Sequence, residues 1–203
     1  MPGEVNGRGP RRQQLLDAAA SVFAAKGYRQ ASISHIITAA GVARGTFYLY
    51  FRSKDAIFAA ILDEVRGRLA AALNEPLGPT LVHDGHATLR ADILRWLRFF
   101  ETHRAAASIL LREATSIDPR FEPKVESLRR EALDHFARRF RDLQVRGLVR
   151  GGISPELTGH LQLGMFDQLV IALVLRPGWK VKLDVLADQL ADFAWNGVRP
   201  SDK

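Results

Sequence analysis

Apolar residues recur at steps of three and four along most of the chain. Residues at this spacing lie on one face of an α-helix. The clearest stretch places apolar side chains at Phe121, Val125, Leu128, Ala132, Phe136, Phe140 and Leu143. No run alternates between apolar and polar residues over the length of a strand. The pattern therefore predicts an all-α protein of about nine helices.

Glycine, proline and serine mark where several of these helices begin and end. The first apolar stripe stops at Gly27 and the second at Gly41, since glycine tolerates the backbone conformation that ends a helix. Ser53 is the predicted N-cap of a long helix that ends before Pro76. The segment 75–85 holds two Pro and two Gly, which is typical of a linker.

The charge of the chain is unevenly spread. Its 203 residues carry 29 Lys and Arg against 22 Asp and Glu, a formal net charge of +7. Residues 1–55 hold eight of the basic and three of the acidic residues, so this quarter carries +5. Such an excess favours an anionic partner, either a nucleic acid or a membrane surface.

The composition also excludes several classes of protein. The chain has no Cys, which excludes disulfides, thiolate metal sites and a Cys nucleophile. Its first ten residues lack the apolar segment of a signal peptide. The longest apolar run, Leu169–Leu175, is far shorter than the ~20 residues that a spanning helix needs. We therefore expect a cytoplasmic protein without a membrane partner.

Residues 32–54 predict two short helices joined by a tight turn. They read SISHIITAAGVARGTFYLYFRSK, with the turn at Gly41-Val42-Ala43. This spacing is typical of a helix-turn-helix, although a plain helical corner has it too. Once its apolar positions are buried, the second helix exposes Arg44, Gly45, Thr46, Tyr48 and Leu49. A cation, hydroxyl groups and a small glycine can contact bases and phosphates in a DNA groove.

This stretch closely resembles the DNA-binding domain of the TetR (tetracycline-repressor-like) family of transcriptional regulators. The matching residues are Ala40-Gly41-Val42, Arg44-Gly45-Thr46-Phe47-Tyr48, Tyr50-Phe51 and Ser53-Lys54. The resemblance is strong over residues 11–60 and loose beyond them. It implies a flexible tail at 1–10, a helix-turn-helix domain at 11–55 and a ligand-binding and dimerisation domain at 56–203.

The resemblance also assigns residues to the DNA. These are Ser32, Ser34, Arg44, Gly45, Thr46, Tyr48, Leu49, Tyr50 and Lys54. It places Arg44, Gly45, Thr46 and Leu49 on the side of the recognition helix that faces the groove. Ser34 can then reach a neighbouring base or phosphate.

The remaining positions are expected at phosphates or in the core. Tyr48 and Lys54 would contact phosphates, and Ser32 would cap the helix at 33–40 and donate to a phosphate as well. Tyr50 is either a phosphate contact or a core residue. The family often has a hydroxyl residue at Ala43 and a small residue at Ile37, so the operator sequence is harder to infer.

Two C-terminal helices, at 155–175 and 181–196, are the best candidates for a dimer interface. The first is apolar on too many sides to serve one core, although a fully buried core helix would show the same pattern. In this family the last two helices form a four-helix bundle with their counterparts. The resemblance therefore implies a homodimer on a palindromic operator, with half-sites about one DNA turn, ~34–36 Å, or a multiple of it apart.

The resemblance further implies a pocket for a small-molecule inducer that releases the DNA. Candidate lining residues are Trp96, Phe99, Phe100, His103, Leu110 and Phe166, although an ordinary core position explains each of them as well. Their side chains favour a hydrophobic or aromatic ligand. An anionic head group could be held by Arg95, Arg98, Arg104 and Arg112, for which a solvated face is the simpler explanation.

The sequence gives little support to catalysis. The segment His83-Asp84-Gly85-His86 lacks a third ligand at a recognised spacing, so we expect no metal site and no other cofactor. No nucleophile, paired carboxylates or phosphate-binding loop accompany the other histidines. Two other classes remain open: a ligand-binding protein or enzyme on the same scaffold, and an interaction protein whose basic N-terminal part binds anionic lipid.

Overall fold

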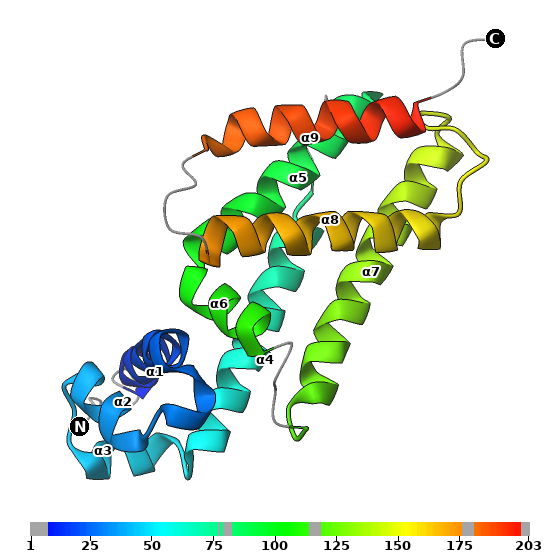
Figure 1. The fold of residues 1–203 in the computed structure, drawn as a ribbon. Helices are drawn as coiled ribbons and strands as arrows, with labels where there is room; N and C mark the ends of the chain where they lie inside the picture. Colours follow the sequence, from blue (N-terminus) through cyan, green and yellow to red (C-terminus); the bar gives the residue numbers. More distant parts are fainter. Residues whose placement is uncertain (1–7, 77, 79–82, 114–118, 176–180, 200–203) are drawn as a thin grey trace, which may run out of the picture. The chain divides into compact units, whose positions relative to one another are not determined.

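The computed structural model describes residues 8–76, 78, 83–113, 119–175 and 181–199 (Figure 1). These ranges hold nine α-helices and no strand, which confirms the all-α prediction. The helices are α1 (Arg8–Gln30), α2 (Ile33–Ala40), α3 (Arg44–Tyr50), α4 (Lys54–Asn74), α5 (Gly85–Thr102), α6 (Arg104–Glu113), α7 (Glu122–Val145), α8 (Pro155–Leu175) and α9 (Leu183–Val198). Within these ranges, no helix is long and apolar enough to cross a membrane.

The chain divides into two compact units. One unit comprises the described residues of Met1–Arg66 together with Ala105–Val125, and the other comprises Gly67–Arg104 together with Glu126–Lys203. The first unit therefore holds α1 to α3 and most of α4 and α6. The second holds α5, α8, α9 and most of α7, and each unit has its own apolar core.

The first three helices begin and end close to the predicted residues. Gly27 interrupts α1 with φ 75° and ψ 160°, although three further residues follow before the helix ends. The hydroxyl of Ser32 accepts from the backbone N–H of His35, whose ring accepts from the N–H of Ser32, so the two residues cap α2 reciprocally. Gly41 closes α2 with φ 61°, a conformation that favours glycine.

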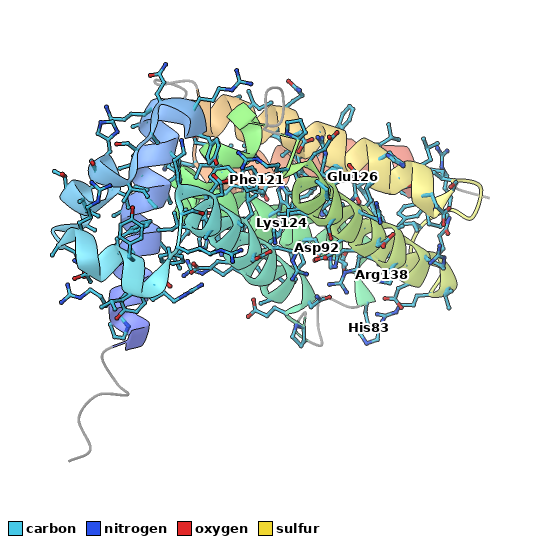
Figure 2. All side chains as sticks on the ribbon, turned by 90° about the horizontal axis from the view of Figure 1, so that it is seen from below. His83, Asp92, Phe121, Lys124, Glu126 and Arg138 are labelled. Carbon is cyan, nitrogen blue, oxygen red and sulfur yellow. The ribbon has the colours of Figure 1, made fainter. Side chains whose placement is uncertain are left out.

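An aromatic cluster forms much of the core of the first unit. Phe58 of α4 packs edge-on against Phe23 of α1, with ring centroids 5.1 Å apart. Phe121, just before α7, lies 4.7 Å from Phe58 and 5.3 Å from Tyr28. Lys124 follows at the same end of α7 (Figure 2). A segment distant in sequence thus packs against the ends of the helices that precede and follow the helix-turn-helix.

The second unit packs α5 against α8 and α9. Gly85 allows the closest approach, because a Cβ there would lie 2.6 Å from the ring of Trp195. Asp84 caps α5, so Gly85 and His86 lie in its first turn and not in a linker. The side chain of His86 contacts Asp192 of α9 at 2.8 Å. No group of three possible metal ligands occurs among the residues that the structure describes.

Candidate nucleic-acid interface and ligand cavity

Buried side chains fix which face of α3 is exposed. Ile36 of α2 and Phe47 of α3 are fully buried, and Phe51 lies behind Phe47 with ring centroids 6.0 Å apart. The opposite side of α3 is left uncovered in the first unit. There Tyr48 is 47% exposed and Leu49 is 82% exposed. Leu49 and Tyr48 lie side by side on this uncovered face, so apolar and aromatic surface is exposed there together.

The start of α3 exposes backbone N–H groups and a cationic side chain. Ala43 is its N-cap and provides no side-chain hydrogen bond, so the first backbone N–H groups depend on other partners. Arg44 is exposed and its guanidinium lies 6.0 Å from the centre of the Tyr48 ring. A cation, the exposed Gly45 and a phenol therefore lie on one face, as the helical spacing predicts.

The other predicted DNA residues lie around this face with different degrees of exposure. Ser34 is exposed in the first turn of α2, and Thr46 and Tyr50 are half-buried. The capping role predicted for Ser32 is confirmed by its hydrogen bond with His35. A phosphate contact by any of these groups remains a prediction.

Lys54 has a role that sequence reasoning did not identify. Its ammonium donates to the backbone carbonyls of Tyr28 at 2.8 Å and of Ala31 at 2.9 Å, and it lies 4.4 Å from the Tyr28 ring. The hydroxyl of Tyr28 in turn donates to Asp55, which also accepts from Arg120. Lys54 thus ties the end of α1 to the start of α4, and its predicted phosphate contact is untested.

Five of the six predicted ligand residues fall into two groups. Trp96, Phe100 and Phe166 are buried with Phe136, and the ring centroids of Trp96 and Phe166 are 5.4 Å apart. Phe99 stacks on His103, the residue that follows α5, with ring centroids 4.4 Å apart. The side chain of Leu110 lies outside the described residues.

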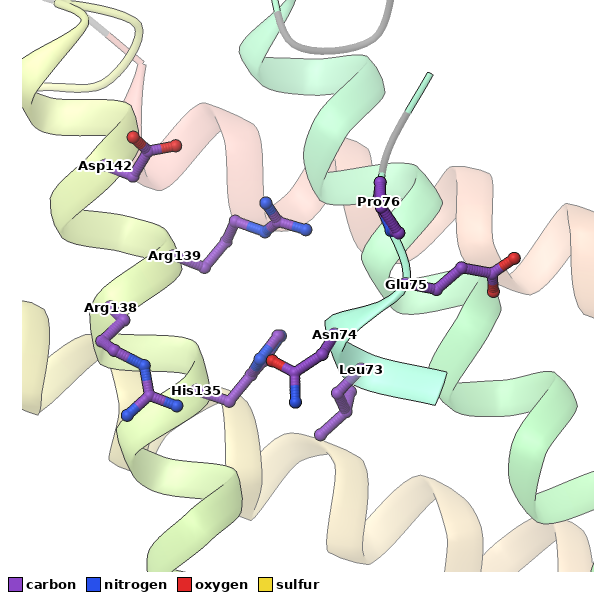
Figure 3. Close-up of a pocket in the computed structure, with 8 residues that line it drawn as sticks. All are labelled: Leu73, Asn74, Glu75, Pro76, His135, Arg138, Arg139 and Asp142. Atoms are coloured by element: carbon purple, nitrogen blue, oxygen red, sulfur yellow. The ribbon is translucent and has the colours of Figure 1, made fainter. Parts of the chain in front are cut away.

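A cavity of about 250 Å³ lies in the second unit, and none of those six residues lines it (Figure 3). Its walls come from the C-terminal end of α4 and the middle of α7. The lining residues are Leu73, Asn74, Glu75, Pro76, His135, Arg138, Arg139 and Asp142. Sequence reasoning missed them because polar residues on α7 look like the solvated side of an amphipathic helix. His135, which lies next to Phe136 of the apolar stripe, was the one available signal.

Comparison with known proteins identifies the family. The family model for "Bacterial regulatory proteins, tetR family" matches residues 15–61. The chain is 32% identical over 158 residues to the HTH-type transcriptional repressor Rv1474c of Mycobacterium tuberculosis, covering 72% of this chain and 84% of that protein. The chain belongs to the TetR family of bacterial regulatory proteins. It is therefore a DNA-binding transcriptional regulator and not an enzyme.

Two further comparisons show how much of this TetR-family regulator is shared with a known sequence and with a solved structure. The chain is 44% identical over 77 residues to the uncharacterized HTH-type transcriptional regulator YvdT of Bacillus subtilis, covering 34% of this chain. That match spans only 38% of the length of YvdT. The transcriptional regulator FadR from Bacillus subtilis, solved in complex with stearoyl-CoA, has a TM-score of 0.73 at 23% identity, covering 89% of this chain and 96% of FadR. At that identity the likeness concerns the fold.

Proposed function

We propose that this TetR-family regulator is a homodimeric repressor that binds a palindromic operator and releases it when a small, hydrophobic or aromatic ligand binds its C-terminal unit. The exposed face of α3 is the observation that carries the proposal. It combines Arg44, Gly45, Tyr48 and Leu49 on a rigid helix, and a solvated helix has no need of that combination.

The chemistry of this face suits the major groove of DNA. Arg44 can donate two hydrogen bonds to the edge of a guanine, and Leu49 can contact the methyl group of a thymine. Tyr48 can donate its hydroxyl to a phosphate, and the exposed Gly45 lets the backbone approach closely. The net charge of +5 on residues 1–55 supports attraction to the phosphate backbone.

An apolar surface on α8 and α9 supports the homodimer. Leu157 and Leu161 are one helical turn apart on α8 and are more than half exposed, and Phe193 of α9 is 76% exposed. Other side chains of α8, such as Phe166 and Val170, are fully buried inside the unit. A helix with one buried face and a second exposed apolar face fits burial against a second copy of the chain.

The ligand part of the proposal rests on the second unit and on the family. FadR from Bacillus subtilis was solved in complex with stearoyl-CoA, a ligand with a long apolar acyl chain and an anionic coenzyme A part. The described cavity at α4 and α7 offers a place for a smaller molecule. Binding there would lower operator affinity if the ligand-bound form holds the two recognition helices at a spacing that does not match the half-sites.

The test measures binding to the DNA upstream of the gene by fluorescence anisotropy. Arg44→Ala and Tyr48→Ala should each weaken specific binding about tenfold or more, because each removes a contact to a base or phosphate. Arg130→Ala is the matched control, since it removes an exposed arginine of α7 in the other unit. Light scattering should show an intact dimer for all three variants.

Two results would refute the proposal for DNA. One is an operator affinity that is unchanged in both α3 variants. The other is a fall of only a few-fold in wild-type affinity between about 50 and 200 mM salt, because six or more phosphate contacts imply a loss of roughly a thousandfold.

A further inference from the structure

We propose that the cavity between the end of α4 and the middle of α7 binds the carboxylate of a small apolar acid. The inference rests on the proposed function, because it names the chemical class of the ligand. Figure 3 shows His135 and Arg139 reaching from α7 toward the end of α4, with Arg138 beside them.

The first observation is an unpaired cation at the rim. Arg138 is exposed and makes no hydrogen bond or ion pair with any residue that the structure describes. The other charged groups of the lining are paired. Arg139 donates two hydrogen bonds to Asp92, at 2.9 and 3.3 Å, and Asp142 pairs with Arg146 at 3.0 Å. The remaining carboxylate, Glu75, has Arg95 3.9 Å away.

This charge count selects a ligand with one negative charge. One guanidinium is left uncompensated in the wall, and a carboxylate would neutralise it and accept two parallel hydrogen bonds from it. A neutral ligand would leave the charge as it is. A cation would be repelled by Arg138 and by the neighbouring arginines. A phosphate dianion would bring a second charge for which the described lining offers no unpaired cation.

The second observation is a buried imidazole without a partner. His135 is 8% exposed, and its Nε2 forms no hydrogen bond with any described group. Burial and the surrounding arginines lower the pKa of His135 to about 4, so the ring is neutral near pH 7. A buried polar atom without a partner costs roughly 1–3 kcal/mol, unless a ligand or water completes it. Because that nitrogen is buried, a bound carboxylate would accept its N–H, in the suitable tautomer, once the lining side chains shift to expose it.

The third observation is apolar surface beside these polar groups. Leu73 and Pro76 line the wall, and Phe136, which does not line the cavity, lies with its ring 5.6 Å from that of His135. Phe136 packs against Trp96, whose Nε1 is also buried without a partner among the described groups. A volume of about 250 Å³ equals roughly eight water molecules at ~30 Å³ each. Benzoate and hexanoate are acids of this size.

The experiment titrates the dimeric wild-type protein with sodium benzoate and sodium hexanoate in a calorimeter, with benzamide, benzylamine and inorganic phosphate as comparison probes. We expect saturable binding of at least one of the two acids, and binding of benzamide at least about tenfold weaker than that of benzoate. Arg138→Gln should weaken binding of the acid about tenfold or more, since it removes a charge-assisted hydrogen bond.

Arg130→Gln is the matched control, because Arg130 is an exposed arginine on the same helix that does not line the cavity. It should bind the acid as the wild type does. His135→Leu removes the ring nitrogen and should also weaken binding. Unchanged thermal unfolding of Arg138→Gln would exclude a general loss of structure as the cause.

The outcomes separate this inference from the proposed function. Failure of both acids to bind, binding of phosphate in preference to both, or equal affinities in Arg138→Gln and Arg130→Gln would each overturn the inference, whatever the protein does to DNA. Acid binding that depends on Arg138 but does not change operator affinity would support the inference and contradict ligand-induced release.

Discussion

Large apolar side chains are exposed on α3 and on α8 and α9, and the charged residues around them differ between these two surfaces. On α3, Leu49 lies in a stretch that carries Arg44 and Arg52 and no acidic residue. On α8 and α9, Leu161 and Phe193 are exposed, and the acidic residues of α9 are paired with basic residues of α5, as in Asp188 with Arg90. A cationic apolar face suits DNA, whereas an apolar face whose nearby charges are already paired suits a second protein surface.

The largest expected effect comes from placing a charge on α8. Leu161→Glu would bury an unpaired carboxylate in the proposed dimer interface, which costs several kcal/mol. We expect a monomer by light scattering. Operator affinity should fall by more than about a hundredfold, because the two half-sites would no longer be bound as a linked pair. A Leu161→Glu variant that remains a dimer would contradict the assignment of this surface.

Val145→Glu is the control for that experiment. Val145, at the end of α7, is 83% exposed and belongs to neither of the two surfaces. The same charge there should leave both the dimer and operator affinity unchanged. A comparable loss at Val145 would mean that added negative charge acts through the net charge of the protein.

The next effect concerns the cationic surface. Leu49→Glu places a carboxylate on the face of α3 that is proposed to enter the groove. Repulsion by phosphates should lower operator affinity about tenfold to a hundredfold, or ~1–3 kcal/mol, with the dimer intact. Anisotropy and light scattering on one sample measure both. If Leu49→Glu binds the operator like the wild type, α3 does not face the DNA.

The helix-turn-helix and the cavity were not equally predictable from the sequence. The helix-turn-helix was predicted from the resemblance of residues 32–54 to the TetR family. The cap at Ser32, the turn at Gly41 and the buried Phe47 in the structure agree with it. The cavity was not predicted, because it depends on α4 and α7 meeting across about sixty residues of chain, and no local pattern reports that. The hydrogen bonds of Lys54 were missed for a similar reason: its carbonyl partners at Tyr28 and Ala31 precede it by more than twenty residues, and its phosphate contact stays a prediction.

The acid sensitivity of the second unit gives a smaller effect. His135 has a pKa of about 4 in the folded chain against an ordinary value of 6.5. The unfolded chain therefore binds more protons in this range, and the free energy of unfolding falls as the pH is lowered from 6.5 to 4. The charged groups around the ring include Arg95 and Asp92 of α5 and Arg138 and Arg139 of α7.

Urea unfolding at several pH values measures this contribution. Between pH 6.5 and 4 the free energy of unfolding of His135→Gln should fall by about 2–3 kcal/mol less than that of the wild type, because the amide of Gln does not titrate. The carboxylates titrate in both proteins, so their effect cancels in the difference. Equal losses in the two proteins would show that His135 is not the group that charges on unfolding.

The smallest effect separates two cations of the first unit. Arg44 is exposed on α3, whereas Lys54 donates to two backbone carbonyls at the end of α1. Lys54→Met should therefore lower the free energy of unfolding by about 1–2 kcal/mol, since it removes charge-assisted hydrogen bonds at a half-buried site. Arg44→Met should leave stability unchanged, weaken specific operator binding, and reduce the salt dependence of that binding because it removes one positive charge per subunit from the DNA-facing surface. If Lys54→Met reduces that salt dependence equally without a loss of stability, Lys54 contacts phosphate, and the cationic surface extends beyond α3 to the start of α4.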